Sequence, residues 1–331
     1  MVLNKNIKII LNYFLGPIIF LLLLYAIYYQ LLQKNNWRES LQQIKDALNG
    51  SSQWKLWIVF LLMFVNWGIE ARKWQISISS VQQISFWRAF KATLTGTTMA
   101  SFTPNRMGEY LGRILYVEEG KRIQSISLTI VCSISQMIVT MLLGCAGIIY
   151  LQSHLHNVQI PNVQAFRLAL NILLSVVVIA FAILLVFYFR LSWVVRLMNI
   201  LRIPEKYLVY VKILEGLNAT ILLRILSLSF VRYAVFIMQY YFLFSVFGVS
   251  LTALQAFSSV SVVFLVMAVV PTFTVLTELG LRWEASIQVV QLFSANTVGI
   301  FATSFGIWLI NLVIPALAGS LLILGIKLFK K

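Results

Sequence analysis

Long apolar segments follow one another along almost the whole chain, and short polar segments separate them. A helix needs about 20 mostly apolar residues to cross the hydrocarbon layer of a bilayer. Six segments are predicted to cross: Ile9 to Leu31, Trp54 to Ile69, Ile126 to Leu151, Phe166 to Phe189, Ile221 to Phe247 and Val298 to Ile326. We therefore expect an all-α, polytopic membrane protein with about six crossings.

Two further apolar segments differ from the crossings because each ends at a proline. Phe86 to Thr103 ends at Pro104, and Leu251 to Val270 ends at Pro271. Charged residues and a second short helical pattern follow each proline. We interpret both segments as re-entrant hairpins that enter the membrane and return; for residues 251–271 a full crossing stays open as the alternative.

The two predicted hairpins share one register. Phe90 and Phe257 each follow an alanine, and each precedes the proline of its hairpin by the same interval. Beyond each proline, a glutamate and an arginine stand four residues apart, which puts both on one face of a helix. These pairs are Glu109 with Arg113 and Glu278 with Arg282.

This repetition indicates how the chain is organised. We expect a single integral membrane domain, residues 1–331, in which residues 1–151 and 165–331 form an inverted repeat. Each half contains two crossings, a hairpin and a further crossing. Transporters built in this way bind their substrates near the bilayer midplane, at broken helices.

Composition supports a membrane protein, since 60% of the 331 residues are hydrophobic and only 11% are charged. A soluble domain could not bury so much apolar surface. The net charge of +16 raises the question of whether the protein binds nucleic acid. The basic residues, however, flank apolar helices, which is the pattern that orients membrane proteins. Nucleic acid is therefore not expected as a partner.

The distribution of charge predicts the topology. Arg190 to Arg224 is rich in basic residues, whereas Gln152 to Phe166 and Gly248 to Phe257 contain no charged residue. We expect the protein to lie in the cytoplasmic membrane, with the basic segment and both termini on the cytoplasmic side. Residues 33–55 carry an apolar stripe among basic residues and are interpreted as an amphipathic interfacial helix, with its leaflet left open.

The hairpin motifs resemble a known family. Pro104 to Glu109, with Arg113 after it, is similar to the first signature of the lysylphosphatidylglycerol synthase transmembrane-region family, whose members are flippase-like membrane domains. Pro271 and Glu278 to Ala285 are similar to the second signature, and the order of spans agrees over nearly the whole chain. The resemblance implies a lipid flippase. Some members carry a soluble aminoacyl-transferase domain, and we expect this chain to function without one.

The chemistry of an anionic head group suggests which residues would bind it. A guanidinium grips phosphate through two hydrogen bonds, so Arg106, Arg113 and Arg282 are the expected phosphate ligands. Thr103 and Pro104 are expected to form the cap and first turn of a helix whose free N–H groups favour an anion.

Further residues are expected to support this site. Three carboxylates could neutralise the arginines or carry a proton: Glu109, Glu278 and Glu284. Four residues are expected to shape the hairpins: Pro104, Gly108, Pro271 and Gly280. The alternative is that these charges form structural ion pairs at the membrane rim.

Other polar and aromatic residues are interpreted as structural or are left open. Arg224 is expected to snorkel to the interface, and the role of Arg232, about two turns deeper, stays open. The tryptophans, including Trp54, Trp57, Trp67 and Trp74, are interpreted as interface anchors. No metal is expected, because His154 and His156 have no further histidine or nearby carboxylate.

The sequence therefore favours a flippase of an anionic phospholipid or a polyprenyl-phosphate-type substrate, with membrane lipids as partners and no cofactor or catalytic residue. One alternative is a non-catalytic scaffold for envelope enzymes. A less favoured one is an intramembrane transferase acting on a lipid head group. The sequence also leaves a homo-oligomer open.

Overall fold

The computed structural model describes residues 52–154, 163–200, 212–271 and 275–324, with a few isolated positions before residue 51. These ranges are helical and contain no strand, which confirms the all-α expectation for this part of the chain. The expected crossing Ile9 to Leu31 and most of the amphipathic segment 33–55 lie outside the described residues.

Five helical segments are long and apolar enough to cross a membrane: Gln53–Ile78, Glu119–His154, Arg167–Phe189, Ala219–Val246 and Thr297–Ile323. They correspond to the second to sixth expected crossings. Their helices are α4 (Gln53–Ile78), α7 (Arg122–His154), α8 (Val163–Phe189), α11 (Ala219–Val246), α14 (Thr297–Trp308) and α15 (Ile314–Leu324). A π-helical segment, Leu309–Val313, joins α14 to α15. The short α9 (Leu191–Ile200) follows α8.

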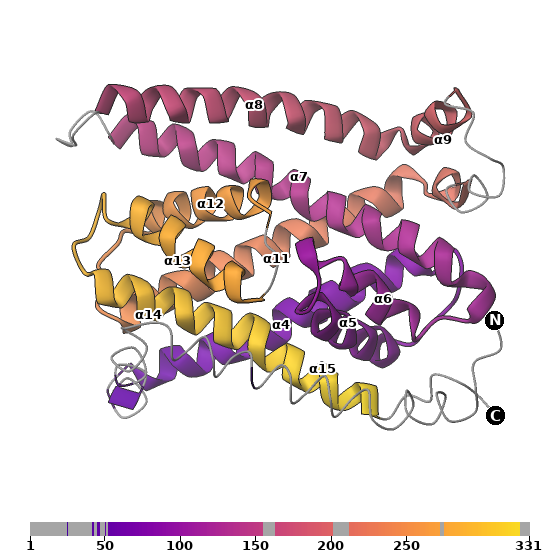
Figure 1. Ribbon diagram of the computed structural model, residues 1–331, viewed down its shortest axis with the longest axis horizontal. Coiled ribbons are helices and arrows are strands. Elements are labelled where there is room, and N and C mark those ends of the chain that lie inside the picture. The colour runs from indigo at the N-terminus through magenta and orange to yellow at the C-terminus, as the bar shows by residue number, and fades with distance from the viewer. Residues whose placement is uncertain are drawn as a thin grey trace.

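Each expected hairpin consists of two helices in contact. The first contains α5 (Phe86–Ala100), a 3-10 turn (Pro104–Arg106) and α6 (Gly108–Ile114). The second contains α12 (Ala253–Val269) and α13 (Val275–Val290). The first hairpin lies in the right half of Figure 1 and the second in the left half.

Glycines allow the two arms of the first hairpin to approach closely. A Cβ added to Gly112 would lie 2.5 Å from the Cα of Gly96, and one added to Gly108 would lie 2.2 Å from the carbonyl oxygen of Met99. Both distances are far below van der Waals contact, so a larger residue would push the arms apart. Gly280 in the second hairpin has open space where its Cβ would be.

Each hairpin packs against the crossing that ends the other half of the chain. Ser258 on α12 donates a hydrogen bond of 2.8 Å to the carbonyl oxygen of Gly147 on α7. Thr98 on α5 donates one of 2.6 Å to the carbonyl oxygen of Ala316 on α15. Small residues and hydroxyls of this kind hold membrane helices close together. The hairpins therefore join the two halves into one bundle.

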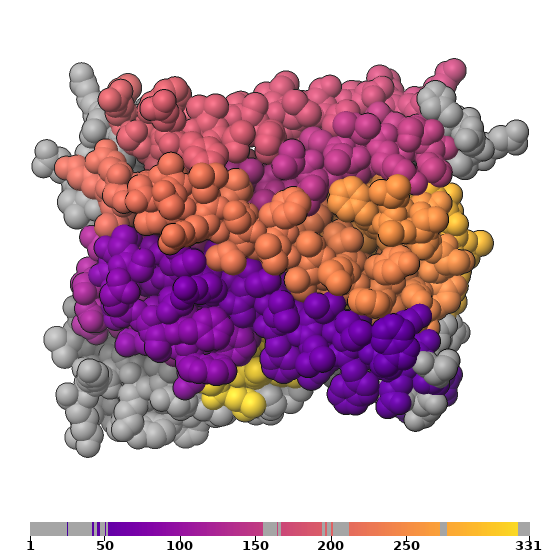
Figure 2. All heavy atoms as spheres, turned by 180° about the vertical axis from the view of Figure 1, so that it is seen from behind, coloured from indigo at the N-terminus to yellow at the C-terminus, as the bar shows by residue number. Residues whose placement is uncertain are grey.

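The remaining crossings enclose this arrangement. Helices α4 and α11 pack side by side across the face seen in Figure 2. Helix α8 forms an edge of the bundle and packs against α7 (Figure 1). Its outer face is a row of exposed apolar residues: Leu168, Ile172, Val176, Ile179, Ile183 and Val186. Their helical spacing gives a continuous surface suited to lipid.

The helix ends separate into two groups. Helices α7 and α11 end on the left of Figure 1, where α14 begins, and α8 and α15 end on the right, where α11 begins. The uncharged Gly248 to Phe257 loop therefore lies at one end of the bundle and the start of the basic segment, at Arg190, at the other. Which end faces the cytoplasm stays a prediction.

Candidate functional site

A cavity of about 360 Å³ lies where the two hairpins meet inside the bundle. Its walls come from α4, α7 and α11, from both hairpins, and from the end of α14 with the π-helical segment. Three lining residues mark its depth. Gln136, Arg232 and Asn311 are residues 18 of 36, 14 of 28 and 15 of 27 in their spans. The cavity therefore lies at half the length of three crossings, where a polar site requires paired or solvated groups.

Arg106 reaches the cavity from the turn of the first hairpin. Asn105 and Arg106 both have left-handed backbone conformations, with φ of 49° and 59°. Such conformations cost roughly 1–2 kcal/mol in a non-glycine residue. The rest of the fold must offset this strain. In this conformation the Arg106 guanidinium lies 3.5 Å from the Glu278 carboxylate of the second hairpin. An ion pair thus links the two hairpins across the cavity.

Arg282 and Glu278 form the second hairpin's contribution. They are one helical turn apart on α13, and the Arg282 guanidinium donates a hydrogen bond of 2.8 Å to Glu278. The guanidinium also donates to the Tyr240 hydroxyl on α11, at 2.8 Å. Both charged side chains are buried, and the Nε of Arg282 has no hydrogen-bond partner among the residues that the structure describes. Within the described part of the chain, Arg282 therefore keeps one unpaired donor beside the cavity.

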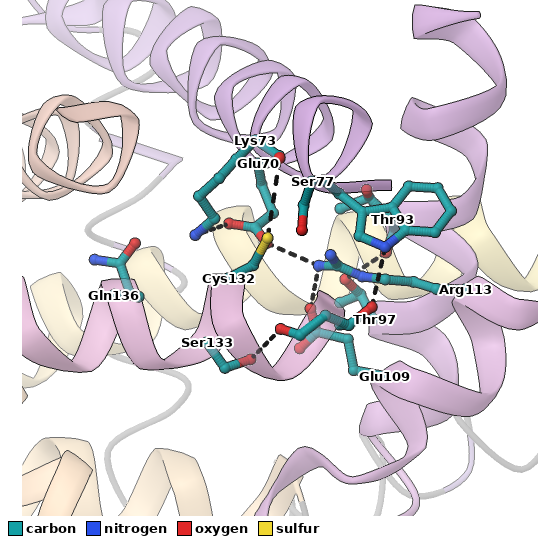
Figure 3. Close-up of polar contacts among 12 residues, drawn as sticks. Glu70, Lys73, Ser77, Thr93, Thr97, Glu109, Arg113, Cys132, Ser133 and Gln136 are labelled. Atoms are coloured by element: carbon teal, nitrogen blue, oxygen red, sulfur yellow. Dashed lines mark hydrogen bonds and ion pairs between the residues drawn. The ribbon is translucent and has the colours of Figure 1, made fainter. Parts of the chain in front are cut away.

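Glu70 of α4 is the centre of a second group of charges (Figure 3). Its carboxylate lies 2.8 Å from Lys73, 2.8 Å from Arg113 and 3.1 Å from Arg232. Arg113 also donates to Glu109, one turn earlier on α6. Because Glu70 is only 5% exposed, solvent screens these interactions weakly. One buried carboxylate thus joins cations from three helices.

Arg232, whose role the sequence left open, points into the cavity from the middle of α11. Its Nε donates a hydrogen bond of 2.8 Å to Asn66 on α4. The guanidinium carbon lies 5.6 Å from the ring centre of Trp67 and 5.4 Å from that of Phe236, within the range of cation–π attraction. The residue is a cavity-lining cation, whereas Arg224 is exposed.

A chain of buried amides continues from Asn66 through the bundle. Asn66 donates to Asn311 at 3.1 Å, Asn311 donates to Gln239 at 3.1 Å, and Gln239 donates to the Val59 carbonyl oxygen at 3.0 Å. Asn311 lies in the π-helical segment, an irregularity that is frequent at functional sites. Of these amides Asn311 lines the cavity, and its hydrogen bonds to Asn66 and Gln239 hold it in place there.

The structure brings together four of the expected charged residues at the cavity: Arg106, Glu109, Glu278 and Arg282. Arg113 lies behind the cavity wall, with its side chain fully buried between Glu70 and Glu109. Glu284 points elsewhere and accepts a hydrogen bond from Gln288 on an exposed face.

The two hairpin prolines lie at or near helix ends. Pro104 opens the 3-10 turn, and Pro271 is exposed after α12. The α-helix begins at Gly108 rather than at Pro104, and the Gly108 N–H donates to the Thr103 hydroxyl at 2.6 Å. That N–H is therefore not free for an anion.

Sequence reasoning missed several residues of this site. Glu70 and Lys73 were left out because the apolar run ends at Ile69, whereas helix α4 continues to Ile78. A pair of opposite charges one turn apart, Glu70 and Lys73, was the signal that could have marked them. The polar residues Asn66, Gln136 and Asn311 inside apolar runs were a second signal.

Two tryptophans were interpreted wrongly. Trp54 and Trp57 are exposed, as expected of interface anchors, but Trp67 and Trp74 are buried. The Trp74 ring packs 5.7 Å from the Arg113 guanidinium, and its indole N–H donates to Thr129. His154, also considered, stacks on Tyr150 and packs against Phe293; His156 lies outside the described residues.

Comparison with protein families identifies the chain. The model of the family described as "Lysylphosphatidylglycerol synthase TM region" matches residues 13–319. The chain belongs to this family. The match includes both hairpins and every residue that lines the cavity. Comparison with curated proteins and with solved structures gives no match. The family name supplies no substrate for this member.

Proposed function

We propose that this member of the lysylphosphatidylglycerol synthase transmembrane-region family is a flippase that moves an anionic lipid or lipid-linked substrate across the cytoplasmic membrane. The observation that carries the proposal is a polar, cation-rich cavity at half the length of three crossings. A head group crossing the membrane needs polar partners at the depth where lipid offers none, while its hydrocarbon chains stay in the bilayer.

The charges in and beside the cavity favour an anion. Among the described residues these are five cations and three carboxylates: Lys73, Arg106, Arg113, Arg232 and Arg282, with Glu70, Glu109 and Glu278. Positive charge is in excess, and an unneutralised cation at this depth is costly. A phosphate group relieves that cost through charge-assisted hydrogen bonds.

Lipid movement in proteoliposomes tests the proposal. Wild type would be compared with Arg106→Ala and Arg282→Ala, using tail-labelled phosphatidylglycerol, phosphatidic acid and a polyprenyl phosphate at equal reconstitution. We expect wild type to move at least one of these lipids, and both variants to move it at least about tenfold more slowly, since each loses a charge-assisted contact. Arg72→Ala is the matched control, because Arg72 is exposed on α4 and contacts only Gln75 among the contacts described.

The outcomes separate transport from misfolding. Each variant must elute from size exclusion and unfold on heating as wild type does before its rate is compared. No movement of any of the three lipids by wild type would refute the proposal. Equal rates in wild type and both variants would show that lipid does not pass along these arginines.

We also propose that the two halves form an inverted repeat with both termini in the cytoplasm. The reciprocal packing of α5 on α15 and of α12 on α7 supports the repeat. The test introduces Ser250→Cys or Glu215→Cys into a cysteine-free chain and labels intact cells with an impermeant thiol reagent. We expect labelling at Ser250→Cys only, whereas labelling at Glu215→Cys only would reverse the orientation.

A further inference from the structure

Among the described residues, the charged side chains in and beside the cavity form two groups. The first charge group contains Glu70, Lys73, Glu109, Arg113 and Arg232, which is three cations with two carboxylates. The second charge group contains Arg106, Glu278 and Arg282, which is two cations with one carboxylate. Each group therefore has one positive charge in excess.

The excess in the first charge group is built into its geometry. Lys73, Arg113 and Arg232 all lie within 3.1 Å of the one Glu70 carboxylate, which has two oxygens to share among them. Among the described residues, Glu109 forms an ion pair with Arg113 only. Lys73 and Arg232 line the cavity itself, so the uncompensated charge faces the space that a ligand would fill.

The second charge group holds one of its cations weakly. Glu278 lies 2.8 Å from Arg282 but 3.5 Å from Arg106. The longer distance exceeds the roughly 2.7–2.9 Å of a good charge-assisted hydrogen bond. The Arg106 side chain is also 36% exposed, unlike the buried Arg282. Arg106 is therefore the cation that can turn from Glu278 to a ligand at the least cost.

Head groups differ in how many of these charges they neutralise. A zwitterion adds no net charge, and a phosphodiester such as phosphatidylglycerol adds one negative charge. A phosphomonoester has a second pKa of about 6 and so carries close to two negative charges at pH 8. Of these head groups, only the phosphomonoester carries enough negative charge to neutralise the one excess positive charge of each charge group. The volume of about 360 Å³ is at the lower end for ligand pockets, which suits a head group without its chains.

We propose that the cavity selects a head group with two negative charges, a phosphomonoester or a diphosphate diester, over singly charged and zwitterionic head groups. The inference rests on the proposed function, which makes the ligand a membrane lipid, and it names the chemical class of that lipid's head group. In the bound state the phosphate lies between the two charge groups. Arg106 then leaves Glu278 and donates to the phosphate, so occupancy loosens the ion pair that links the hairpins.

Binding measured apart from transport tests this selectivity. The full-length protein in detergent is titrated calorimetrically at pH 8 with dihexanoyl phosphatidic acid, phosphatidylglycerol and phosphatidylcholine, which share their chains and differ in the head group. We expect phosphatidic acid to bind at least about tenfold more tightly than phosphatidylglycerol, with phosphatidylcholine weakest.

Variants connect the preference to the named charge. Arg106→Gln removes one excess positive charge and is expected to reduce the ratio of the affinities for phosphatidic acid and phosphatidylglycerol several-fold. Arg106→Lys keeps the charge and is expected to retain most of the preference. Arg72→Gln makes the same change on an exposed face and is expected to leave all three affinities unaltered.

The two proposals fail in different ways. Equal affinities for phosphatidic acid and phosphatidylglycerol would overturn the selectivity, and so would a lack of binding by all three lipids. Lipid movement in proteoliposomes could persist in either case. Selective binding of phosphatidic acid without movement of any lipid would instead support the site while refuting transport.

Discussion

The Glu70 carboxylate is the residue whose neutralisation should damage this protein most. In Glu70→Gln the side chain keeps its shape but loses the charge that three cations share. Breaking a buried ion pair by removing one partner costs about 3–5 kcal/mol, because the remaining charge stays buried without compensation. Here Lys73 and Arg232 lose the carboxylate they contact, whereas Arg113 retains Glu109. We therefore expect the free energy of unfolding of Glu70→Gln to fall by an amount in the upper part of that range.

Thermal unfolding in detergent measures this loss. The chain has two cysteines, of which Cys132 is buried and Cys145 is partly exposed. In a Cys145→Ser background, a thiol-reactive fluorogenic dye labels Cys132 only when the bundle opens. We expect the apparent midpoint of Glu70→Gln to fall by about 5 °C or more. Glu119→Gln is the control, because Glu119 is 86% exposed and its ion pair is weak.

A second substitution distinguishes charge imbalance from lost packing. Adding Lys73→Met to Glu70→Gln removes one of the cations left uncompensated, so part of the lost stability should return. Equal midpoints for wild type and Glu70→Gln would refute the electrostatic argument. A double variant less stable than Glu70→Gln would indicate that the Lys73 contacts themselves, rather than its charge, maintain the bundle.

Two further predictions concern uncharged parts of the same site. Gly112→Ala should destabilise the first hairpin by about 1–3 kcal/mol, because its Cβ would lie 2.5 Å from the Cα of Gly96; the dye assay measures the fall in midpoint. Asn311→Ala should cost about 1–3 kcal/mol, since it leaves the buried Asn66 amide without its acceptor, and should also slow lipid movement in proteoliposomes.

Matched substitutions check both predictions. Gly280→Ala introduces the same methyl group into open space and should leave the midpoint almost unchanged. Asn171→Ala removes an exposed asparagine that bonds Gln152 on the surface of α8, and should have little effect. Equal effects of Gly112→Ala and Gly280→Ala, or of Asn311→Ala and Asn171→Ala, would contradict the reasoning from buried contacts.

The helices could be predicted from the sequence far better than the site. Arg106 and Arg282 were found because each stands in a motif that follows a proline of a hairpin. Glu70 was missed for the opposite reason, since a hydropathy run treats a charge as the end of a crossing. Helix α4 nevertheless continues past Glu70 to Ile78, because cations from α6 and α11 compensate that charge inside the bundle.

The sequence by itself determined that this protein is helical and membrane-spanning, and where most of its crossings lie. This follows from a local requirement, since each segment in hydrocarbon must satisfy its own backbone hydrogen bonds and expose apolar side chains. The tertiary structure decided which charges meet. Arg106 meets Glu278 of the other hairpin, and Arg232 meets Asn66, 166 residues away, because buried polar groups pair by proximity in space. Helical spacing relates residues a turn apart, but only the packing of the two hairpins against each other, and of α4 against α11, brings these distant side chains together.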